Sequence, residues 1–330
     1  MSEQSAIAAA HDRMVQEYDD LDDLYYPWLF ARLHEFIAAH LPAAPNPARR
    51  AVDAGCGTGF QSFLLVQAGY DVTGLDLAAR LVDAAQAKSP LFSVPPLLSP
   101  PFFRSSLGDS WIAAHHRRLA KQLDLARSGR NVRLPRFVCA DLRDFPLEPG
   151  TIDVITCCGS VVSFLDEYAQ VIYRMASSLR LGGRLFLEVE QKRNLDLFWP
   201  VLDRLSAGAL GYGQSWPVVL ANLAAPPGRS VRVRYPFELR DGSELTLPIW
   251  LFSVREFEEL FCRCNLRVVA RVGVHHVTNL VPSTVLHKPA PPPALRGVFN
   301  LLRCADGALG TRWPFWRLGC SVAFCLEKRA

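Results

Sequence analysis

Three glycines at alternating positions follow a short apolar segment, in the string Ala51-Val52-Asp53-Ala54-Gly55-Cys56-Gly57-Thr58-Gly59-Phe60. Glycine allows a tight turn and lets a ligand approach the backbone closely, because it has no Cβ. The residues after the turn are predicted to be helical, and the start of a helix offers free N–H groups to a ligand. A strand, a glycine turn and a helix in this order indicate a nucleotide-binding site.

The spacing of the glycines and two later acids indicate which nucleotide is bound. The dinucleotide fingerprint is G-x-G-x-x-G/A, whereas this turn is G-x-G-x-G with Phe60 where the third small residue would stand, which disfavours NAD. Asp76 ends the next predicted strand, and Asp141 ends the one after it. A carboxylate at the first position can accept hydrogen bonds from ribose hydroxyls, and one beside an adenine can accept from its exocyclic amine.

Alternating strands and helices must position these residues. Amphipathic stretches separate short apolar runs, and this alternation predicts parallel βαβ units in a doubly wound α/β sheet. Gly182-Gly183 is expected to be the turn before the fifth strand, and one or two helices are expected in the first 40 residues. The predicted strands cover 51–53, 70–76, 136–141, 152–158, 184–190, 267–274 and 320–327, and the predicted helices cover 62–68, 78–87, 166–181, 253–264 and 295–303.

Two stretches interrupt this alternation. Residues 89–134 are rich in proline and then polar, with a helix expected at 111–127, and they are predicted to be an insertion that could act as a lid. Residues 191–250 are predicted to form a roof over the substrate, because alternating segments around Arg240-Asp241-Gly242 indicate a β-hairpin. The expected organisation is an N-terminal helical cap at 1–48 and a core formed by 49–190 and 251–330.

Composition excludes several classes of protein. Half of the 330 residues are hydrophobic, 21% are charged and the net charge is +4, with no long uncharged apolar run and no clustered basic stripe. A membrane span and a nucleic-acid partner are therefore not expected. The N-terminus has no signal-peptide pattern, which favours a cytoplasmic protein. The nine cysteines lack the spacing of a zinc site and are an odd number, so neither a metal nor a disulfide framework is expected.

The motifs resemble those of the class I S-adenosylmethionine-dependent methyltransferases. Asp53 to Gly59 is similar to the first motif of that family, Asp76 to its ribose acid, Asp141 to its adenine acid, and Leu181-Gly182-Gly183-Arg184-Leu185 to the segment leading into its fifth strand. The resemblance implies a Rossmann-like sheet of seven strands, mostly parallel with the last antiparallel, and S-adenosylmethionine as cofactor. The implied cofactor-binding residues are Tyr18, Asp53, Gly55, Cys56, Gly57, Gly59, Asp76, Leu77, Asp141, Leu142, Cys158 and Gly159.

Within that family, two segments resemble the glycine N-methyltransferase-like group. Cys157 to Leu165 is similar to its loop after strand 4, with Ser160 where Asn is usual, and Arg193-Asn194-Leu195-Asp196 is similar to its "RNYD" segment. This resemblance implies that Arg193 holds a substrate carboxylate. An N-terminal aromatic such as Tyr18, Tyr25 or Tyr26 is expected to close over the cofactor.

The resulting hypothesis is methyl transfer to a nitrogen or oxygen of a small molecule, by in-line displacement at the sulfonium. His275 or His276 is predicted to supply a general base if the acceptor is a hydroxyl. A homodimer is compatible with the sequence. The alternatives are a thiol or metalloid methyltransferase that uses Cys157 or Cys158, a non-catalytic S-adenosylmethionine-binding scaffold, and an NAD(P)-binding protein, which the glycine spacing disfavours.

Overall fold

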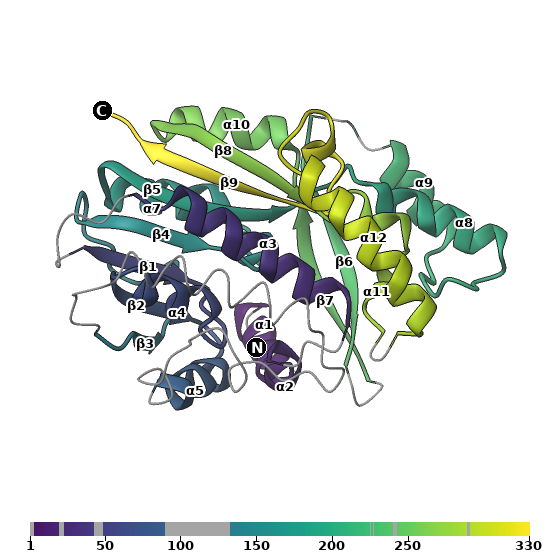
Figure 1. The fold of residues 1–330 in the computed structure, drawn as a ribbon, viewed down its shortest axis with the longest axis horizontal. Coiled ribbons are helices and arrows are strands. Elements are labelled where there is room, and N and C mark those ends of the chain that lie inside the picture. The colour runs from purple at the N-terminus through teal and green to yellow at the C-terminus, as the bar shows by residue number, and fades with distance from the viewer. Residues whose placement is uncertain are drawn as a thin grey trace.

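The computed structural model describes residues 3–19, 23–42, 49–89, 133–224, 226, 228–239, 243–288 and 291–330. The helix expected at 111–127, almost all of the insertion expected at 89–134, and the predicted hairpin turn at 240–242 lie outside these residues. The described part forms a central sheet with helices on both faces (Figure 1).

The sheet has seven strands in the order β3-β2-β1-β4-β5-β9-β8. β1 to β5 pair in parallel, and β9 pairs antiparallel with both β5 and β8. The predicted doubly wound sheet, with its antiparallel last strand, is therefore confirmed. The strands are β1 (Arg50–Ala54), β2 (Asp71–Asp76), β3 (Arg136–Cys139), β4 (Ile152–Cys157), β5 (Leu179–Glu190), β8 (Leu266–Val274) and β9 (Ser321–Lys328).

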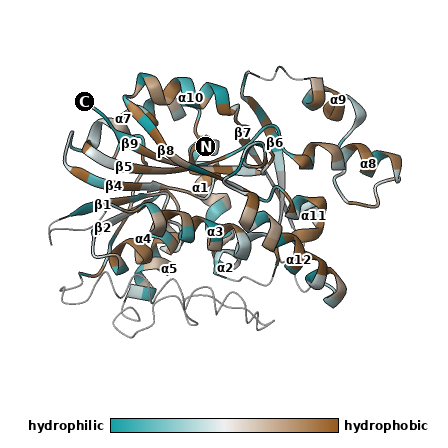
Figure 2. Ribbon diagram, turned by 45° about the horizontal axis from the view of Figure 1, so that its top comes forward, coloured by the Kyte–Doolittle hydropathy of each residue, from teal (hydrophilic) through white to brown (hydrophobic). Residues whose placement is uncertain are grey.

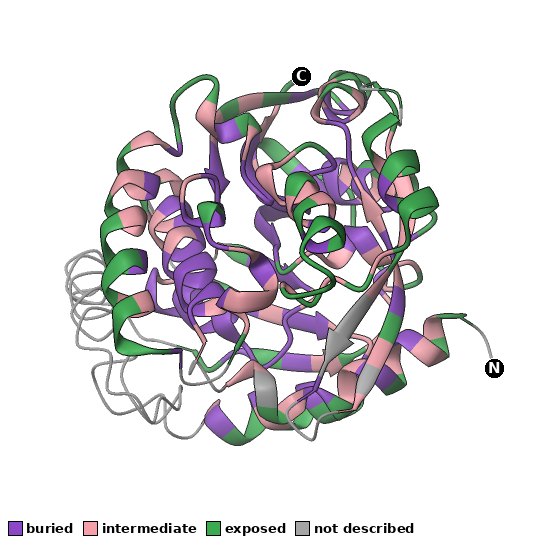
Figure 3. Cartoon of the chain, turned by 90° about the vertical axis from the view of Figure 1, so that its right-hand side faces the viewer, coloured by how far each residue is buried: buried purple, intermediate pink, exposed green. Residues whose placement is uncertain are grey.

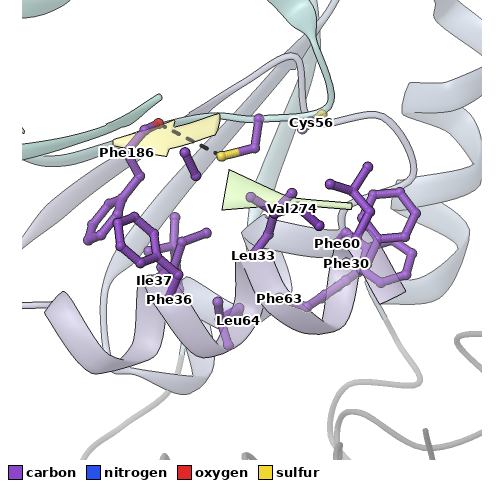
Figure 4. Packing of buried hydrophobic residues seen from close by; sticks show 14 of the residues in the cluster. Phe30, Leu33, Phe36, Ile37, Cys56, Phe60, Phe63, Leu64, Phe186 and Val274 are labelled. Atoms are coloured by element: carbon purple, nitrogen blue, oxygen red, sulfur yellow. Dashed lines mark hydrogen bonds between the residues drawn. The ribbon is translucent and has the colours of Figure 1, made fainter. Parts of the chain in front are cut away.

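Helices cover both faces because each presents an apolar side to the sheet. On one face, Leu33 and Ile37 of α3 pack with Phe63 and Leu64 of α4 and with Phe186 of β5 (Figure 4). The other face holds a second apolar cluster. The first face carries α3 (Tyr25–His40), α4 (Phe60–Gln67) and α5 (Ala79–Lys88), and the second carries α7 (Tyr168–Ser178) and α10 (Val254–Arg263).

The carboxyl ends of the parallel strands share one edge of the sheet, and two additions cover that edge. Ile7 and Ala10 of the first helix pack against Leu247 of the hairpin. The N-terminal addition comprises α1 (Glu3–Arg13) and α2 (Val15–Tyr18), so there are three helices before β1 rather than one or two. The hairpin pairs β6 (Val231–Glu238) with β7 (Glu244–Leu251), as predicted.

Four further helices gather at one end of the molecule (Figure 1): α8 (Trp199–Leu205), α9 (Trp216–Ala224), α11 (Ser283–Leu286) and α12 (Pro293–Leu309). The short 3-10 helices η3 (Leu195–Phe198) and η4 (Thr278–Leu280) contact each other, and η5 (Phe315–Arg317) contacts β8. A further 3-10 helix, η2 (Val161–Phe164), follows β4. No helix among the described residues is long and apolar enough to cross a membrane.

The predicted turn at Gly182-Gly183 is wrong. Helix α7 ends at Ser178, and β5 begins immediately at Leu179 and continues through both glycines. The register with β4 shifts between Ile152 and Val154, so the glycines form an irregularity inside the strand. Gly182 has φ +75°, and a Cβ on Gly183 would lie 2.8 Å from the carbonyl oxygen of Arg180. The glycines are therefore needed for a bulge rather than for a connection.

Asp306 of α12 is a buried anchor that joins α12 to α3 and η4. Its carboxylate accepts hydrogen bonds from Trp28 Nε1 at 2.9 Å, Val277 N at 2.7 Å and Thr278 N at 3.2 Å. We expect Asp306→Ala to lower the free energy of unfolding by about 3 kcal/mol or more, since it leaves buried donors unpaired. Chemical denaturation would measure the change, with the exposed Asp144→Ala as control. Equal stability of the two variants would contradict the anchoring role.

Candidate functional site

The glycine turn between β1 and α4 has the backbone geometry that the sequence predicts. Gly55, Gly57 and Gly59 have φ of +76°, +52° and +94°, which is the left-handed region that favours glycine. A Cβ on Gly55 would collide with the side chain of Val161, and one on Gly59 would lie 2.7 Å from Phe63. The backbone of Gly55 and of Cys56 donates to the carbonyl of Leu75 at 2.8 Å, which holds the turn against the end of β2.

Asp53 supports this turn from inside the protein. Its carboxylate is 1% exposed and accepts hydrogen bonds from Ser62 Oγ of α4 at 2.6 Å and from Thr156 Oγ1 of β4 at 2.8 Å. Burial raises its pKa to about 6 despite these hydrogen bonds. Asp53 therefore ties the helix after the turn to the neighbouring strand, and it acts on the site through the backbone.

Asp76 lies at the end of β2 beside the turn. One carboxylate oxygen accepts from Gly57 N at 2.8 Å and the other from Ala78 N at 2.9 Å. Burial raises the pKa of this carboxyl, while the backbone hydrogen bonds oppose that rise. Leu77 follows as a half-buried residue. The structure thus brings Asp76 and the glycine turn together, as predicted.

The N-terminal segment lies over the turn. The ring of Tyr18 is 3.6 Å from the position of a Cβ on Gly57, and burial raises the pKa of its phenol. Asp19 accepts from Thr58 Oγ1 at 2.7 Å and pairs with Lys88, whose Nζ also donates to the Thr58 carbonyl at 3.0 Å. We refer to Asp19, Thr58 and Lys88 as the N-terminal latch. Sequence reasoning missed it because its members are far apart in the chain.

Asp141 is two residues beyond β3, and its carboxylate is paired with an arginine. Arg143 donates to it through its backbone N at 2.9 Å, Nε at 3.0 Å and Nη2 at 2.7 Å, and this hydrogen bonding lowers the pKa of Asp141. The next residue, Leu142, is buried and its carbonyl accepts from Arg174. The adenine-binding role of Asp141 and Leu142 stays a prediction.

The loop after β4 is held by an acid that sequence reasoning missed. Glu188 on β5 is fully buried and accepts from Gly159 N at 2.9 Å and Ser160 N at 2.7 Å. Two residues later, Glu190 accepts from Ser160 Oγ at 2.7 Å. The signal was available in the sequence, because two acids alternate with apolar residues at the end of an apolar strand.

Glu190 belongs to an acidic and aromatic cluster beside this loop. Burial and then the neighbouring Glu188 and Asp196 raise its pKa to about 8. Tyr25, Tyr26 and Tyr235 also have raised phenol pKa values, for which burial is the largest cause and Glu190 one of the smaller ones. Glu190, Tyr26 and Tyr235 are half-buried, so each retains some accessible surface.

The two predicted histidines have structural hydrogen bonds. His275 is fully buried, its Nε2 donates to the carbonyl of Tyr25 at 3.0 Å, and its Nδ1 lies 2.9 Å from Thr278 Oγ1. Burial lowers its pKa to about 4, so the ring is neutral. The ring of Tyr25 stacks on it at 4.0 Å. His276, also buried, lies 3.0 Å from the carbonyl of Asp306. These contacts give both rings a structural role and disfavour the general base, which stays a prediction.

The other predicted residues are placed less favourably for chemistry. Arg193 is exposed in the turn after β5, outside the acidic and aromatic cluster. Cys157 and Cys158 are buried, and burial raises the pKa of both thiols, which disfavours the reactive thiolate that the thiol-transfer alternative needs. No cluster of metal-ligating side chains occurs among the described residues.

Comparisons with known proteins agree with this geometry. A family model described as a methyltransferase domain matches residues 26–271. The ubiquinone biosynthesis O-methyltransferase of Ralstonia nicotianae is 24% identical over 179 residues, which are 52% of this chain and 59% of that protein. A malonyl-(acyl-carrier protein) O-methyltransferase of Serratia marcescens is 24% identical over 208 residues, which are 62% of this chain and 66% of that protein. The matches thus span less than two thirds of these relatives.

A solved structure shows the same fold over the whole chain. The CcbJ methyltransferase from Streptomyces caelestis superposes with a TM-score of 0.52 and 12% identity, and the match covers 100% of both chains. The predicted class and architecture are therefore confirmed. This chain belongs to the methyltransferase domain family and has the Rossmann-like fold of the class I S-adenosylmethionine-dependent methyltransferases.

Proposed function

We propose that this protein transfers a methyl group from S-adenosylmethionine to a nitrogen or oxygen atom of a small molecule. The observation that carries the proposal is the glycine turn, in which three left-handed glycines meet the Asp76 carboxylate and the ring of Tyr18 at one edge of the sheet. Ligands of open α/β sheets bind at this edge. The family match and the names of the curated relatives support the same activity.

The residues present fit this cofactor. Each of the three glycines has a positive φ, which a residue with a side chain would adopt only with strain. Asp76 retains accessible surface next to them. In the proposed arrangement, the backbone of Gly55 and Gly57 faces the methionine part, Asp76 the ribose and Asp141 the adenine. When bound, the cofactor supplies a methyl group already activated by its sulfonium, so the protein has to position and desolvate the acceptor.

The cluster around Glu190 is proposed to receive the acceptor. Carboxylates and phenols can accept hydrogen bonds from an N–H or O–H group. The carboxylates of Glu188 and Asp196 act electrostatically on Glu190 and raise its pKa further. We propose that the Glu190 carboxylate binds the acceptor group and takes its proton. Arg193, exposed outside this cluster, stays a predicted clamp for a carboxylate on the same substrate.

Thermal shift measurements test the cofactor first. A ligand that binds only the folded state raises its stability by mass action. We expect S-adenosylmethionine and S-adenosylhomocysteine to raise Tm, and NAD and NADP to leave it unchanged. A shift with the nicotinamides alone would contradict the proposed site.

Transfer of an isotopically labelled methyl group tests the acceptor. Small amines and phenols are expected to become labelled, whereas RNA and denatured protein are not. Cofactor binding without any transfer would favour the non-catalytic scaffold, and transfer only to macromolecules would contradict a small-molecule acceptor.

A further inference from the structure

The helices α8, α9 and α12 lie at one end of the molecule (Figure 1), and they carry many hydrophobic residues (Figure 2). Of the fifteen large apolar side chains that are strongly exposed among the described residues, seven lie between 198 and 223 and three between 298 and 313. Soluble proteins rarely expose apolar side chains in such a group unless the surface has a partner. We call the exposed apolar side chains of α8 and α9 and of the end of η3 the apolar end face, defined by Phe198, Leu205, Trp216 and Leu220. Leu301 on α12 and Trp313 after it are further exposed apolar side chains.

Hydrogen bonds to buried groups hold the helices of the apolar end face in place. Asp203, which is 1% exposed, accepts from the backbone N atoms of Leu210 at 2.8 Å and Gly211 at 3.0 Å and so orders the connection between α8 and α9. Trp199 Nε1 donates to the carbonyl of Asn279 at 2.9 Å and joins α8 to η4. Leu205, Leu301 and Trp313 are nevertheless 71%, 74% and 75% exposed. Figure 3, which views this end directly, shows exposed residues along its helices.

The exposed charges in the segments that form this end are basic. In the described parts of 193–229 and 277–318 the acids are Asp196, Asp203 and Asp306. Asp203 and Asp306 are buried, and Asp196 is hydrogen-bonded to Tyr212 and Ser283. The exposed basic residues include Arg204, Lys288 and Arg312, whereas Arg317 is paired with Glu258 of α10 at 3.8 Å. Apolar side chains with a basic rim and exposed tryptophans are the pattern of a helix surface that lies in the interface of an anionic membrane.

We propose that the apolar end face binds the surface of an anionic lipid bilayer. A second copy of the chain fits this face less well, because a two-fold interface would bring the basic rims of both copies together. The side chains would enter the headgroup region while the arginines and lysine contact lipid phosphates. The helices α8 and α9 follow β5 in the chain through η3, so they are linked to the strand that carries Glu190.

Vesicle cosedimentation of the whole chain tests this proposal. We expect binding to vesicles of equimolar phosphatidylcholine and phosphatidylglycerol, weak binding to phosphatidylcholine alone, and release as salt is raised. The double variant Leu205→Ser and Leu220→Ser should bind at least tenfold more weakly. Arg204→Glu and Arg312→Glu together should also reduce binding at least tenfold, since each basic residue near the surface contributes about fivefold.

Matched controls come from exposed residues elsewhere. Tyr173→Ser with Leu181→Ser removes comparable exposed apolar surface, and Arg133→Glu with Arg255→Glu reverses comparable exposed charges. Both pairs should leave vesicle binding unchanged. The Tm of every variant shows whether the variant is folded. Neither Tm nor vesicle binding depends on the proposed methyl transfer.

Two outcomes would overturn the proposal. One is the absence of binding to anionic vesicles, or binding that the face variants and their controls reduce equally. The other is a dimer in sedimentation velocity that Leu205→Ser with Leu220→Ser dissociates while no vesicle binding is seen, because the face would then cover a second copy.

Discussion

Replacing Asp76 with alanine is expected to raise the Kd for S-adenosylmethionine by about 10- to 100-fold, the range for losing hydrogen bonds to a charged group. The loss has two parts. The carboxylate is the proposed acceptor for the ribose hydroxyls, and it also accepts from Gly57 N and Ala78 N, which shapes the turn. Isothermal titration calorimetry measures the affinity directly.

Asp71→Ala is the matched control, because it removes an acid from the other end of the same strand, where the side chain is 45% exposed. It should bind the cofactor like the wild type. Asp76→Asn keeps the shape and one acceptor oxygen, so an intermediate affinity is expected. Wild-type affinity in Asp76→Ala would show that the cofactor does not lie against this turn.

Replacing Glu190 with glutamine is expected to lower kcat by about 100-fold or more, the usual contribution of a positioned general base. Glutamine can still accept a hydrogen bond from Ser160, so the loop after β4 should keep its position. Cofactor affinity should therefore be unchanged. Steady-state kinetics with the acceptor found in the labelling screen would measure the effect, with the exposed Glu148→Gln as control.

The pH dependence separates a base from a structural acid. The pKa of Glu190 is raised to about 8, so the carboxyl is mostly protonated at neutral pH and becomes a proton acceptor as pH rises through that value. In the wild type, kcat should increase with pH across this range, and in Glu190→Gln the increase should disappear. The same rise in both proteins would assign the titration to another group and reject Glu190 as the base.

Much of the fold could be predicted because its signals are local. Central strands such as β4 are rich in apolar residues and buried throughout, and the hairpin has alternating segments on both sides of an Asp-Gly pair. The start of β5 differs from the prediction because a Gly-Gly pair is usually a connection, whereas here β5 pairs with β4 on both sides of Gly182-Gly183, at Leu179 and again from Arg184. Strand pairing between distant segments decided this case.

The same distinction applies to the site. The glycine turn and Asp76 lie within 25 residues and form one βαβ unit, so their spacing alone indicated the cofactor edge. The environment of Glu190 depends on segments that are remote in sequence, since Tyr26 belongs to α3, near the N-terminus, and Tyr235 belongs to β6. The contacts of His275 are likewise not visible in the sequence. Its ring is used to hold Tyr25, and only the packing of α3 against the sheet reveals this.

The N-terminal latch has a consequence for the catalytic cycle. Asp19 binds both Lys88 and Thr58, and Tyr18 lies over Gly57, so this segment covers one side of the turn. In the proposed reaction, we expect each turnover to contain an opening step with no bond chemistry. Exchange of spent for fresh methyl donor is then expected to depend on an ion pair between residues more than 60 positions apart in sequence, outside the strands that form the site.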